Sequence, residues 1–268
     1  MQNTVKQYKA ILAKRSALNH AMGVLSYDSE TAMPKNGAPH MAETMAILSE
    51  ESYKLQVNEE VRGLLNKLNA NSESLDEITR REVEEELKQL KKLENVPMEE
   101  YAAYSRLVSE ASVKWREAKQ TNDYQLFKPY LERIIAAQKS LMAHMYPDKD
   151  TYDALLEEFS EGLSVKMLDP FFADVKAKLV PVIHAVCQSG NQVDDSLLHK
   201  SFPIEGQRKL SEFVMDFLGI DRDSCVIGEV EHPFTTEFNK HDVRLTTHYH
   251  EDDVLSNMFS VAHEGGHC

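Results

Sequence analysis

The fourteen residues Val254–His267, VLSNMFSVAHEGGH, contain the pattern His-Glu-x-x-His. Residues four apart lie on the same face of an α-helix, so His263 and His267 can both reach a single metal ion. Glu264 lies between them, where its carboxylate can accept a proton from a water molecule at the metal. The stretch therefore predicts the helix of a zinc hydrolase, with two imidazoles as metal ligands and a carboxylate as general base.

The residues that precede the motif continue its helical spacing. Leu255 and Phe259 fall in the same row of every fourth residue as the two histidines, and Val254, Met258 and Ala262 widen this apolar face. The pattern predicts that the histidines extend a stripe that faces the protein interior. The same spacing is also compatible with a core helix whose two histidines are only hydrogen-bonded.

Two glycines stand inside the motif, and each costs a helix interior about 1 kcal/mol relative to alanine. Gly265 and Gly266 indicate either that another backbone or a substrate approaches closely, or that the helix frays at this point.

A catalytic zinc site takes three protein ligands, and this motif supplies two. The third is commonly a glutamate from a following helix, whereas the sequence ends at Cys268. Either an upstream carboxylate completes the site or the chain is the front part of a longer protein. We favour the second expectation.

The composition is acidic, with 44 Asp and Glu against 30 Lys and Arg, a net charge of −14. This surplus opposes non-specific binding to nucleic acid and to anionic membranes. No apolar run reaches the length of about 18 residues of a membrane helix, and the first residues do not resemble a secretory signal. Cys187, Cys225 and Cys268 are an odd, sparse set that fits a reducing cytosol better than a disulfide framework. We expect a cytoplasmic protein with neither a nucleic-acid nor a membrane partner.

Apolar residues recur at helical spacing through most of the chain, so we expect a mainly α protein. The predicted helices span residues 5–25, 40–55, 75–95, 97–115, 127–145, 148–159, 164–186 and 204–218. Pro170 and Pro181 interrupt the seventh, which is therefore either one helix or two end to end. Loops are predicted at residues 26–39 and 189–196.

The predicted helix at residues 75–95 is rich in charge. Glu84 stands four residues before Lys88, which favours an ion pair along the helix. The acidic run of Glu82, Glu84, Glu85 and Glu86 is typical of a solvated face.

After Gly219 the pattern changes to short β-like runs at residues 233–238 and 242–249, separated by a turn at residues 239–241. Alternation assigns two sets to opposite faces of the second run: Arg244, Thr246, His248 and His250, and then Val243, Leu245, Thr247 and Tyr249.

Six of the eleven histidines fall within the final 37 residues, which suggests one site, although His248 and His250 fit a solvated strand edge equally well. The edge of such a ribbon can pair with an extended peptide. Arg244 could hold a substrate carboxylate by a two-pronged contact or could orient neighbouring loops, and the sequence slightly favours the structural role.

Three short motifs follow one another in the last part of the sequence. His232-Pro233-Phe234 is similar to an HPF motif, Asp242-Val243-Arg244-Leu245-Thr246 is similar to a DxRxT motif, and HEGGH follows. This order resembles the carboxypeptidase Taq family of metallocarboxypeptidases. Residues 27–48 and 152–164 also look like family segments, so the resemblance spans most of the chain. Tyr27 stands where relatives often have Trp, and family members are about twice as long.

The resemblance implies a helical, zincin-like metallopeptidase with a deep groove, a small β-ribbon next to the HExxH helix, and a homodimeric assembly. His263 and His267 would bind Zn²⁺, with Co²⁺ or Mn²⁺ as substitutes, and Glu264 would be the general base. Six further residues would lie at the closed end of the groove and limit substrate length: His232, Pro233, Phe234, Asp242, Arg244 and Thr246. The implied substrates are peptides with a free C-terminus, which lose single residues with broad specificity but not a C-terminal proline.

We therefore expect residues 1–268 to be a single, mostly helical N-terminal part of a metallocarboxypeptidase domain. The remainder, with the third metal ligand, would be absent, and the chain alone would be inactive. The alternatives are a metallo-endopeptidase or oligopeptidase, and a non-catalytic helical scaffold that only dimerises.

Overall fold

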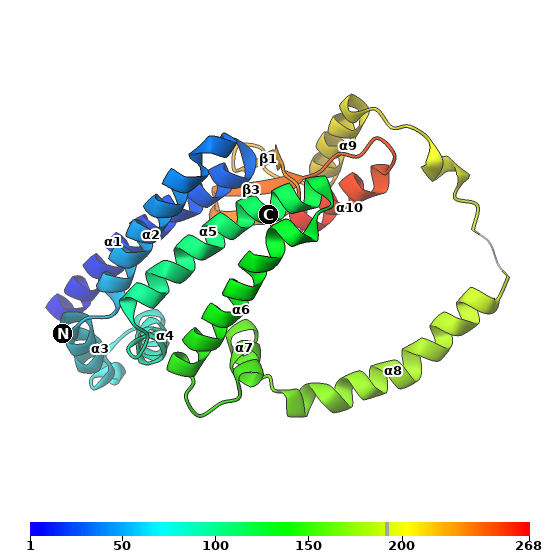
Figure 1. Cartoon of the computed structure of the whole chain (residues 1–268). Coiled ribbons are helices and arrows are strands. Elements are labelled where there is room, and N and C mark those ends of the chain that lie inside the picture. The colour runs from blue at the N-terminus through cyan, green and yellow to red at the C-terminus, as the bar shows by residue number, and fades with distance from the viewer. Residues whose placement is uncertain (191–192) are drawn as a thin grey trace. The chain divides into compact units, whose positions relative to one another are not determined.

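The computed structural model describes residues 1–190 and 193–268, apart from the side chain of His199. This part of the chain is largely helical with one small sheet, as predicted (Figure 1). The helices are α1 (Gln2–Thr31), α2 (Ala38–Gln56), α3 (Glu59–Asn69), α4 (Glu77–Leu93), α5 (Met98–Thr121), α6 (Tyr124–Met145), α7 (Thr151–Phe159), α8 (Val165–Gln188), α9 (Ile204–Phe217) and α10 (Val254–Gly265). Short 3₁₀ turns span Lys35–Gly37, Ser72–Ser74 and Ser196–His199, and the strands are β1 (Cys225–Glu229), β2 (Thr235–Asn239) and β3 (Asp242–Thr247).

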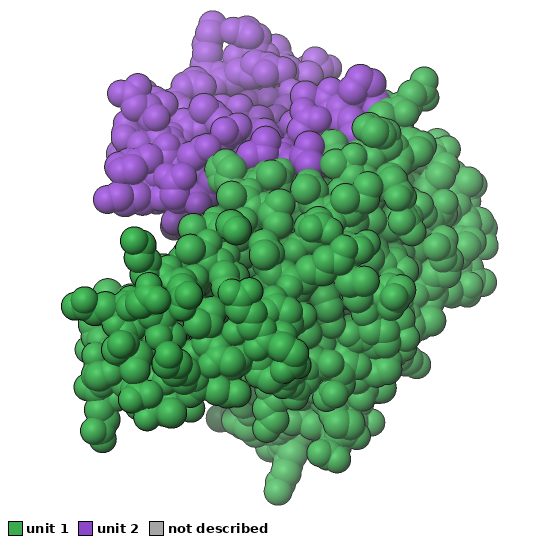
Figure 2. Space-filling model, turned by 90° about the vertical axis from the view of Figure 1, so that its left-hand side faces the viewer, with its two compact units in different colours: residues 1–22, 35–190 green, residues 23–34, 191–268 purple. Residues whose placement is uncertain are grey.

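The chain divides into two compact units, coloured separately in Figure 2. The first comprises Met1–Met22 and Lys35–Gly190 and contains helices only. The second comprises Gly23–Pro34 and Asn191–Cys268, and it contains the end of α1, the sheet, α9 and α10. All the residues predicted to form the site belong to the second unit. No helix in the described residues has the length and apolar character that crossing a bilayer requires.

The first unit is held together by two apolar clusters. One cluster joins α1, α3 and α4 around Tyr8, Leu65 and Leu90. The other joins α2, α6 and α7 around Tyr53, whose hydroxyl donates to the carbonyl of Leu93 at 3.1 Å. The sequence patterns did not predict α3, a helix of eleven residues between two longer ones.

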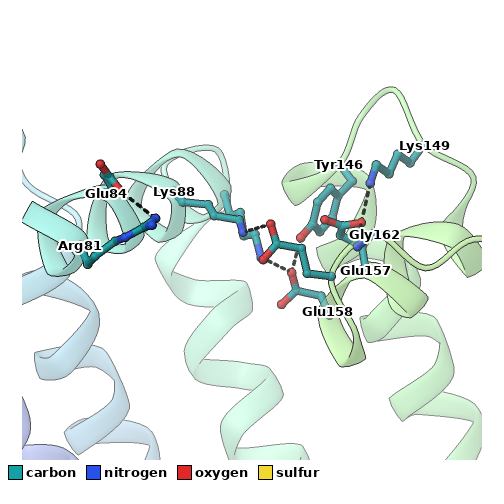
Figure 3. A network of polar contacts seen from close by, with 10 residues as sticks. Arg81, Glu84, Lys88, Tyr146, Lys149, Glu157, Glu158 and Gly162 are labelled. Atoms are coloured by element: carbon teal, nitrogen blue, oxygen red, sulfur yellow. Dashed lines mark hydrogen bonds and ion pairs between the residues drawn. The ribbon is translucent and has the colours of Figure 1, made fainter.

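Charged side chains on α4 pair differently from the sequence prediction. Glu84 pairs with Arg80 at 2.6 Å, one turn before it, and with Arg81 at 3.3 Å (Figure 3). Lys88 pairs with Glu161 beyond α7. The predicted Glu84–Lys88 pair is therefore wrong, because Glu84 pairs with arginines of its own helix and Lys88 pairs with a glutamate from a distant part of the chain.

The acidic run on α4 is likewise not a purely solvated face. Glu82 and Glu86 both turn toward α1, where they pair with Lys9 and Arg15. The spacing along one helix could not show that basic residues about 70 positions earlier face this run.

Helix α1 continues through Thr31, so the predicted loop at residues 26–39 is largely wrong. The Thr31 hydroxyl donates to the carbonyl of Tyr27 at 2.7 Å, and the helix ends before Pro34. Helix α8 is a single helix that contains both Pro170 and Pro181, and none of its residues is buried. The predicted loop at 189–196 lies partly outside the described residues.

The predicted hairpin is present, since β2 and β3 are antiparallel neighbours. The sequence patterns missed β1, which pairs in parallel with β3, so the sheet has the order β1-β3-β2. Cross-strand partners lie on the same face of a sheet. Thr235 is the partner of Leu245 and faces one side, while Thr236 is the partner of Arg244 and faces the other.

Candidate functional site

The HExxH motif lies at the end of α10 and extends just beyond it. Asp253 caps the helix, because its carboxylate accepts the backbone N–H of Ser256 at 3.0 Å. The helix ends at Gly265, and the following turn holds His267, whose N–H donates to the carbonyl of Glu264 at 3.1 Å. The prediction of a helix through the motif is therefore confirmed for its first three residues.

The buried face of α10 is not the predicted one. Phe259 is 62 % exposed, and His263 and His267 are exposed, so the stripe does not face the interior of this chain. The two histidines are for the same reason not core residues of the described part of the chain. The interior instead receives Asn257 and Val261, both fully buried.

Asn257 explains why apolar periodicity selected the wrong face. Its amide oxygen accepts from the hydroxyls of Ser211 at 3.0 Å and Thr247 at 2.9 Å. A buried amide costs little when its hydrogen bonds are made, so a polar residue can occupy the core position. A pattern of apolar residues cannot reveal such partners from α9 and β3.

The two histidines of the motif lie close to each other. Their ring centroids are 5.2 Å apart with an interplanar angle of 83°. Two imidazoles that share a tetrahedral metal through bonds of about 2.0–2.1 Å have ring centres roughly 5 Å apart. The spacing of His263 and His267 and the chemistry of their donors therefore fit one zinc ion.

Glu264 points toward the sheet and is only 9 % exposed. The hydroxyl of Thr235 lies 2.7 Å from its Oε2 atom and 3.0 Å from its backbone oxygen, and donates to either. Thr235 reaches Glu264 because its cross-strand partner Leu245 packs with Val261 in the core beneath α10. One carboxylate oxygen of Glu264, Oε2, thus has a hydrogen-bond partner on the sheet.

The described residues do not provide a third metal ligand beside the two histidines. In residues 1–190 and 193–268, no group of three or more His, Cys, Asp or Glu side chains is placed to hold a metal ion. A recruited upstream carboxylate, the alternative raised by the sequence, is therefore not found in this part of the chain.

The HPF and DxRxT motifs are joined through one threonine. The hydroxyl of Thr246 accepts the N–H of Phe234 at 2.7 Å and lies 2.7 Å from its carbonyl. The N–H of Thr246 donates to the same carbonyl at 3.0 Å. Thr246 is fully buried, so it fixes the backbone of the HPF segment beside β3.

Arg244 lies between two aromatic rings on the opposite face of the sheet from Thr235. Its guanidinium carbon is 5.6 Å from the ring centroids of both Tyr27 and Phe238. Nε and Nη2 donate to the two carboxylate oxygens of Asp242, at 2.5 and 3.2 Å. These bonds raise the pKa of Arg244. This geometry matches an orienting role, while a substrate contact stays a prediction.

Tyr27 is packed tightly against the sheet. Its ring meets that of Phe234 edge-on, with the ring centroids 6.2 Å apart. A side-chain carbon added to Gly228 would lie 2.5 Å from the hydroxyl oxygen of Tyr27. Burial raises the pKa of this phenol. The sequence patterns placed Tyr27 in a loop and assigned it no contact.

Two of the four other histidines in the last 37 residues, His248 and His250, form a separate pair. The rings of His248 and His250 are 4.3 Å apart, and Nδ1 of His248 lies 2.6 Å from the carbonyl oxygen of Val230. His232 is exposed, as is His250, and Pro233 is half-buried. In the described residues, the motif histidines do not form a group that could hold a metal ion with His232, His248 or His250.

Gly265 is required by packing. A side-chain carbon at this position would lie 2.8 Å from Cδ1 of Leu218 and 2.9 Å from Cδ1 of Ile220. The close approach predicted from this glycine is real, but it comes from two side chains and not from a backbone or a substrate. Gly266 follows the last helical residue, in line with the predicted end of the helix.

Two cysteines that are distant in sequence meet beside the motif. The Sγ atoms of Cys225 and Cys268 are 3.3 Å apart. Burial, with the adjacent Cys225 thiol, raises the pKa of Cys268 to about 12. The third cysteine, Cys187, is exposed at the end of α8.

A model of the carboxypeptidase Taq (M32) metallopeptidases matches residues 7–268. The chain belongs to this family. Carboxypeptidase 1 of Bacillus subtilis is 36 % identical over 263 residues, which are 98 % of this chain and 52 % of that relative. Thermostable carboxypeptidase 1 of Pyrococcus furiosus is 30 % identical over 99 % of this chain and 53 % of its own length. The chain spans about half the length of the curated relatives it matches.

Solved structures agree with the family assignment. The crystal structure of BsuCP, 36 % identical, matches with a TM-score of 0.96 over 99 % of this chain and 53 % of that chain. A structure of Pyrococcus furiosus carboxypeptidase, 30 % identical, gives 0.84 over 98 % of this chain and 53 % of its own. The resemblance identified from the three motifs is confirmed.

Proposed function

We propose that the complete protein is a zinc-dependent metallocarboxypeptidase that releases single C-terminal amino acids with broad specificity and does not release proline. Residues 1–268 form the N-terminal part of its domain. The observation that supports this most is the pair of imidazoles 5.2 Å apart with a carboxylate between them in sequence, in a chain of the M32 family. Cytoplasmic location and a homodimer belong to the same proposal.

In this proposal His263 and His267 hold the metal, and a third ligand comes from outside the described residues. When bound, zinc polarises the scissile carbonyl and makes a water molecule more acidic. Cobalt or manganese can take its place in the same donor set.

Glu264 moves the proton. Thr235 occupies Oε2, so Oε1 takes a proton from the attacking water and then delivers it to the leaving nitrogen. A serine or cysteine nucleophile is not needed, because water attacks the peptide directly.

The sheet positions the substrate. β2 is an edge strand of the three-stranded sheet, so its outer edge can pair with an extended peptide. Arg244, fixed by Asp242, and the HPF segment, fixed by Thr246, limit the length of peptide beyond the cleaved bond. This assignment of His232, Pro233 and Phe234 rests on the motifs, as does a deep groove.

The test is Glu264→Gln in the complete protein, with Glu205→Gln at the exposed start of α9 as matched control. We expect Glu264→Gln to abolish peptide hydrolysis while zinc content, measured by atomic emission, stays at the wild-type value. Glu205→Gln should keep both. Full activity of Glu264→Gln, or loss of its zinc, would contradict the role.

The second candidate is a metallo-endopeptidase or oligopeptidase, which uses the same water chemistry and is favoured by the open edge of β2. Peptides with an amidated C-terminus separate the two. A carboxypeptidase should leave them intact, whereas an oligopeptidase should cleave them at internal bonds.

A further inference from the structure

Two thiols of the second unit are in contact although 43 residues separate them. Cys225 is the first residue of β1, and Cys268 directly follows His267. Their sulfur atoms are 3.3 Å apart, so a disulfide bond of about 2.05 Å needs an approach of about 1.3 Å.

The two thiols differ in access to solvent. Cys225 is 4 % exposed and belongs to the apolar cluster with Met215, Leu245 and Val261. Cys268 is an exposed residue, and its N–H donates to the carbonyl of Gly265 at 3.2 Å, which fixes its backbone. The contact between the two sulfur atoms therefore joins a core residue of the sheet to the turn that follows α10.

We propose that Cys225 and Cys268 form a reversible intramolecular disulfide by exchange with a small disulfide such as oxidised glutathione. One of the two thiols, as its thiolate, attacks one sulfur of the oxidant, which releases one glutathione thiolate and leaves a mixed disulfide. The other protein thiol, also as its thiolate, then attacks the protein sulfur of this mixed disulfide and releases the second glutathione. Two protein thiols are oxidised, and one oxidised glutathione is reduced to two thiols.

The bond links the segment that carries His267 to the sheet. Cys225 lies opposite Val243 of β3, at the start of the parallel ladder that β1 forms with that strand. Joining Cys268 to this point restricts the unfolded chain much more than the folded chain, in which the two sulfur atoms are already in contact. Oxidation therefore raises the thermal unfolding midpoint by several degrees, and reduction reverses it.

The experiment uses the purified 268-residue chain, which has three cysteines. The chain is equilibrated in glutathione buffers from fully reduced to fully oxidised. Intact mass, free thiols after unfolding, and non-reduced peptide maps are then measured. We expect the oxidised protein to be lighter by two hydrogen atoms, with Cys187 as its one free thiol and a peptide pair linked through Cys225 and Cys268. Dithiothreitol should restore three thiols. Three free thiols in the oxidised buffer, or a link through Cys187, would overturn the proposal.

Three variants test which thiols form the bond. Cys187→Ser, the matched control, should keep the link. Cys225→Ser and Cys268→Ser should each lose it as long as circular dichroism shows them folded. An internal disulfide in either folded variant would contradict the proposed pairing. If a serine variant does not fold, alanine at the same position replaces it, and the wild-type map decides the link by itself.

Discussion

At the scale of single residues, the hydroxyl of Thr235 connects the segment after the HPF motif to the carboxyl of Glu264. The side chain of Glu264 is nearly buried, and a buried carboxyl that loses its partner costs more than the bond itself contributes. Thr235 therefore affects both the stability of the second unit and the orientation of the proposed general base.

Thr235→Val keeps the shape of the side chain and removes the donor to Oε2 of Glu264. We expect the free energy of unfolding to fall by about 1–3 kcal/mol, measured by urea denaturation. Thr235→Ser, which retains the hydroxyl, should recover most of it. Thr236→Val, on the opposite face of β2, is the control and should change stability by less than about 0.5 kcal/mol. Equal effects at both positions would show that the bond to Glu264 contributes little.

Buried phenols predict how stability depends on pH. Burial raises the pKa of Tyr8, Tyr53 and Tyr101 above that of tyrosine in an unfolded chain. Below about pH 10 both states are protonated, and stability is complete. As pH rises further, the unfolded chain releases protons that the folded chain keeps. The free energy of unfolding therefore falls by about 1.4 kcal/mol per pH unit for each such tyrosine, until the pH reaches the pKa of that tyrosine in the folded chain.

We therefore expect the urea midpoint of unfolding to be level from about pH 7 to 9 and to fall above about pH 10. Tyr101→Phe should make the fall less steep, because its pKa is raised by burial alone. Tyr124→Phe, at a residue 57 % exposed, is the control and should leave the slope unchanged. The same fall in both variants would mean that other groups titrate.

At the scale of elements, local signals were sufficient where a helix buries its own apolar stripe. The bounds of α2, α4, α6, α7 and α9 follow from apolar spacing with capping or turn residues beside it, and the hairpin follows from alternation around its turn. The sequence could not supply partners from elsewhere: α1 continues because Tyr27 packs on Phe234, and β1 forms because β3 offers its second edge. The motif residues were found by their spacing, but Thr235 and Asn257 act through tertiary hydrogen bonds.

Two helical glycines predict opposite effects of the same substitution. A side-chain carbon at Gly63 in α3 would meet no atom within 4 Å, so Gly63→Ala should stabilise by about 0.5–1 kcal/mol. At Gly265 in α10 the added carbon would collide with Leu218 and Ile220, so Gly265→Ala should cost about 1–3 kcal/mol. Urea denaturation of the two variants compares them directly. Stabilisation by both would indicate that the Leu218 and Ile220 side chains move aside freely.

At the scale of the whole molecule, the described residues provide only a part of the proposed metal site. The second unit supplies two imidazoles and a positioned carboxylate, while Phe259 and the motif histidines are exposed. The relatives are about twice as long as this chain. We therefore infer that a complete protein of the relatives' length supplies both the third ligand and a cover for the exposed face of α10.

Zinc affinity should differ accordingly between the 268-residue chain and a polypeptide of the relatives' full length. Loss of a hydrogen-bond partner of a metal ligand already weakens metal binding by about 10–100-fold. The absence of a whole ligand should therefore weaken zinc binding by at least about a hundredfold. Competition with a zinc-binding dye measures both affinities, and the shorter chain should show no peptide hydrolysis. His267→Ala should abolish this difference in zinc affinity, because it weakens zinc binding by the full-length polypeptide. His248→Ala should leave the difference unchanged. Equal affinity in both chains, or hydrolysis by the shorter one, would mean that an upstream carboxylate completes the site after all.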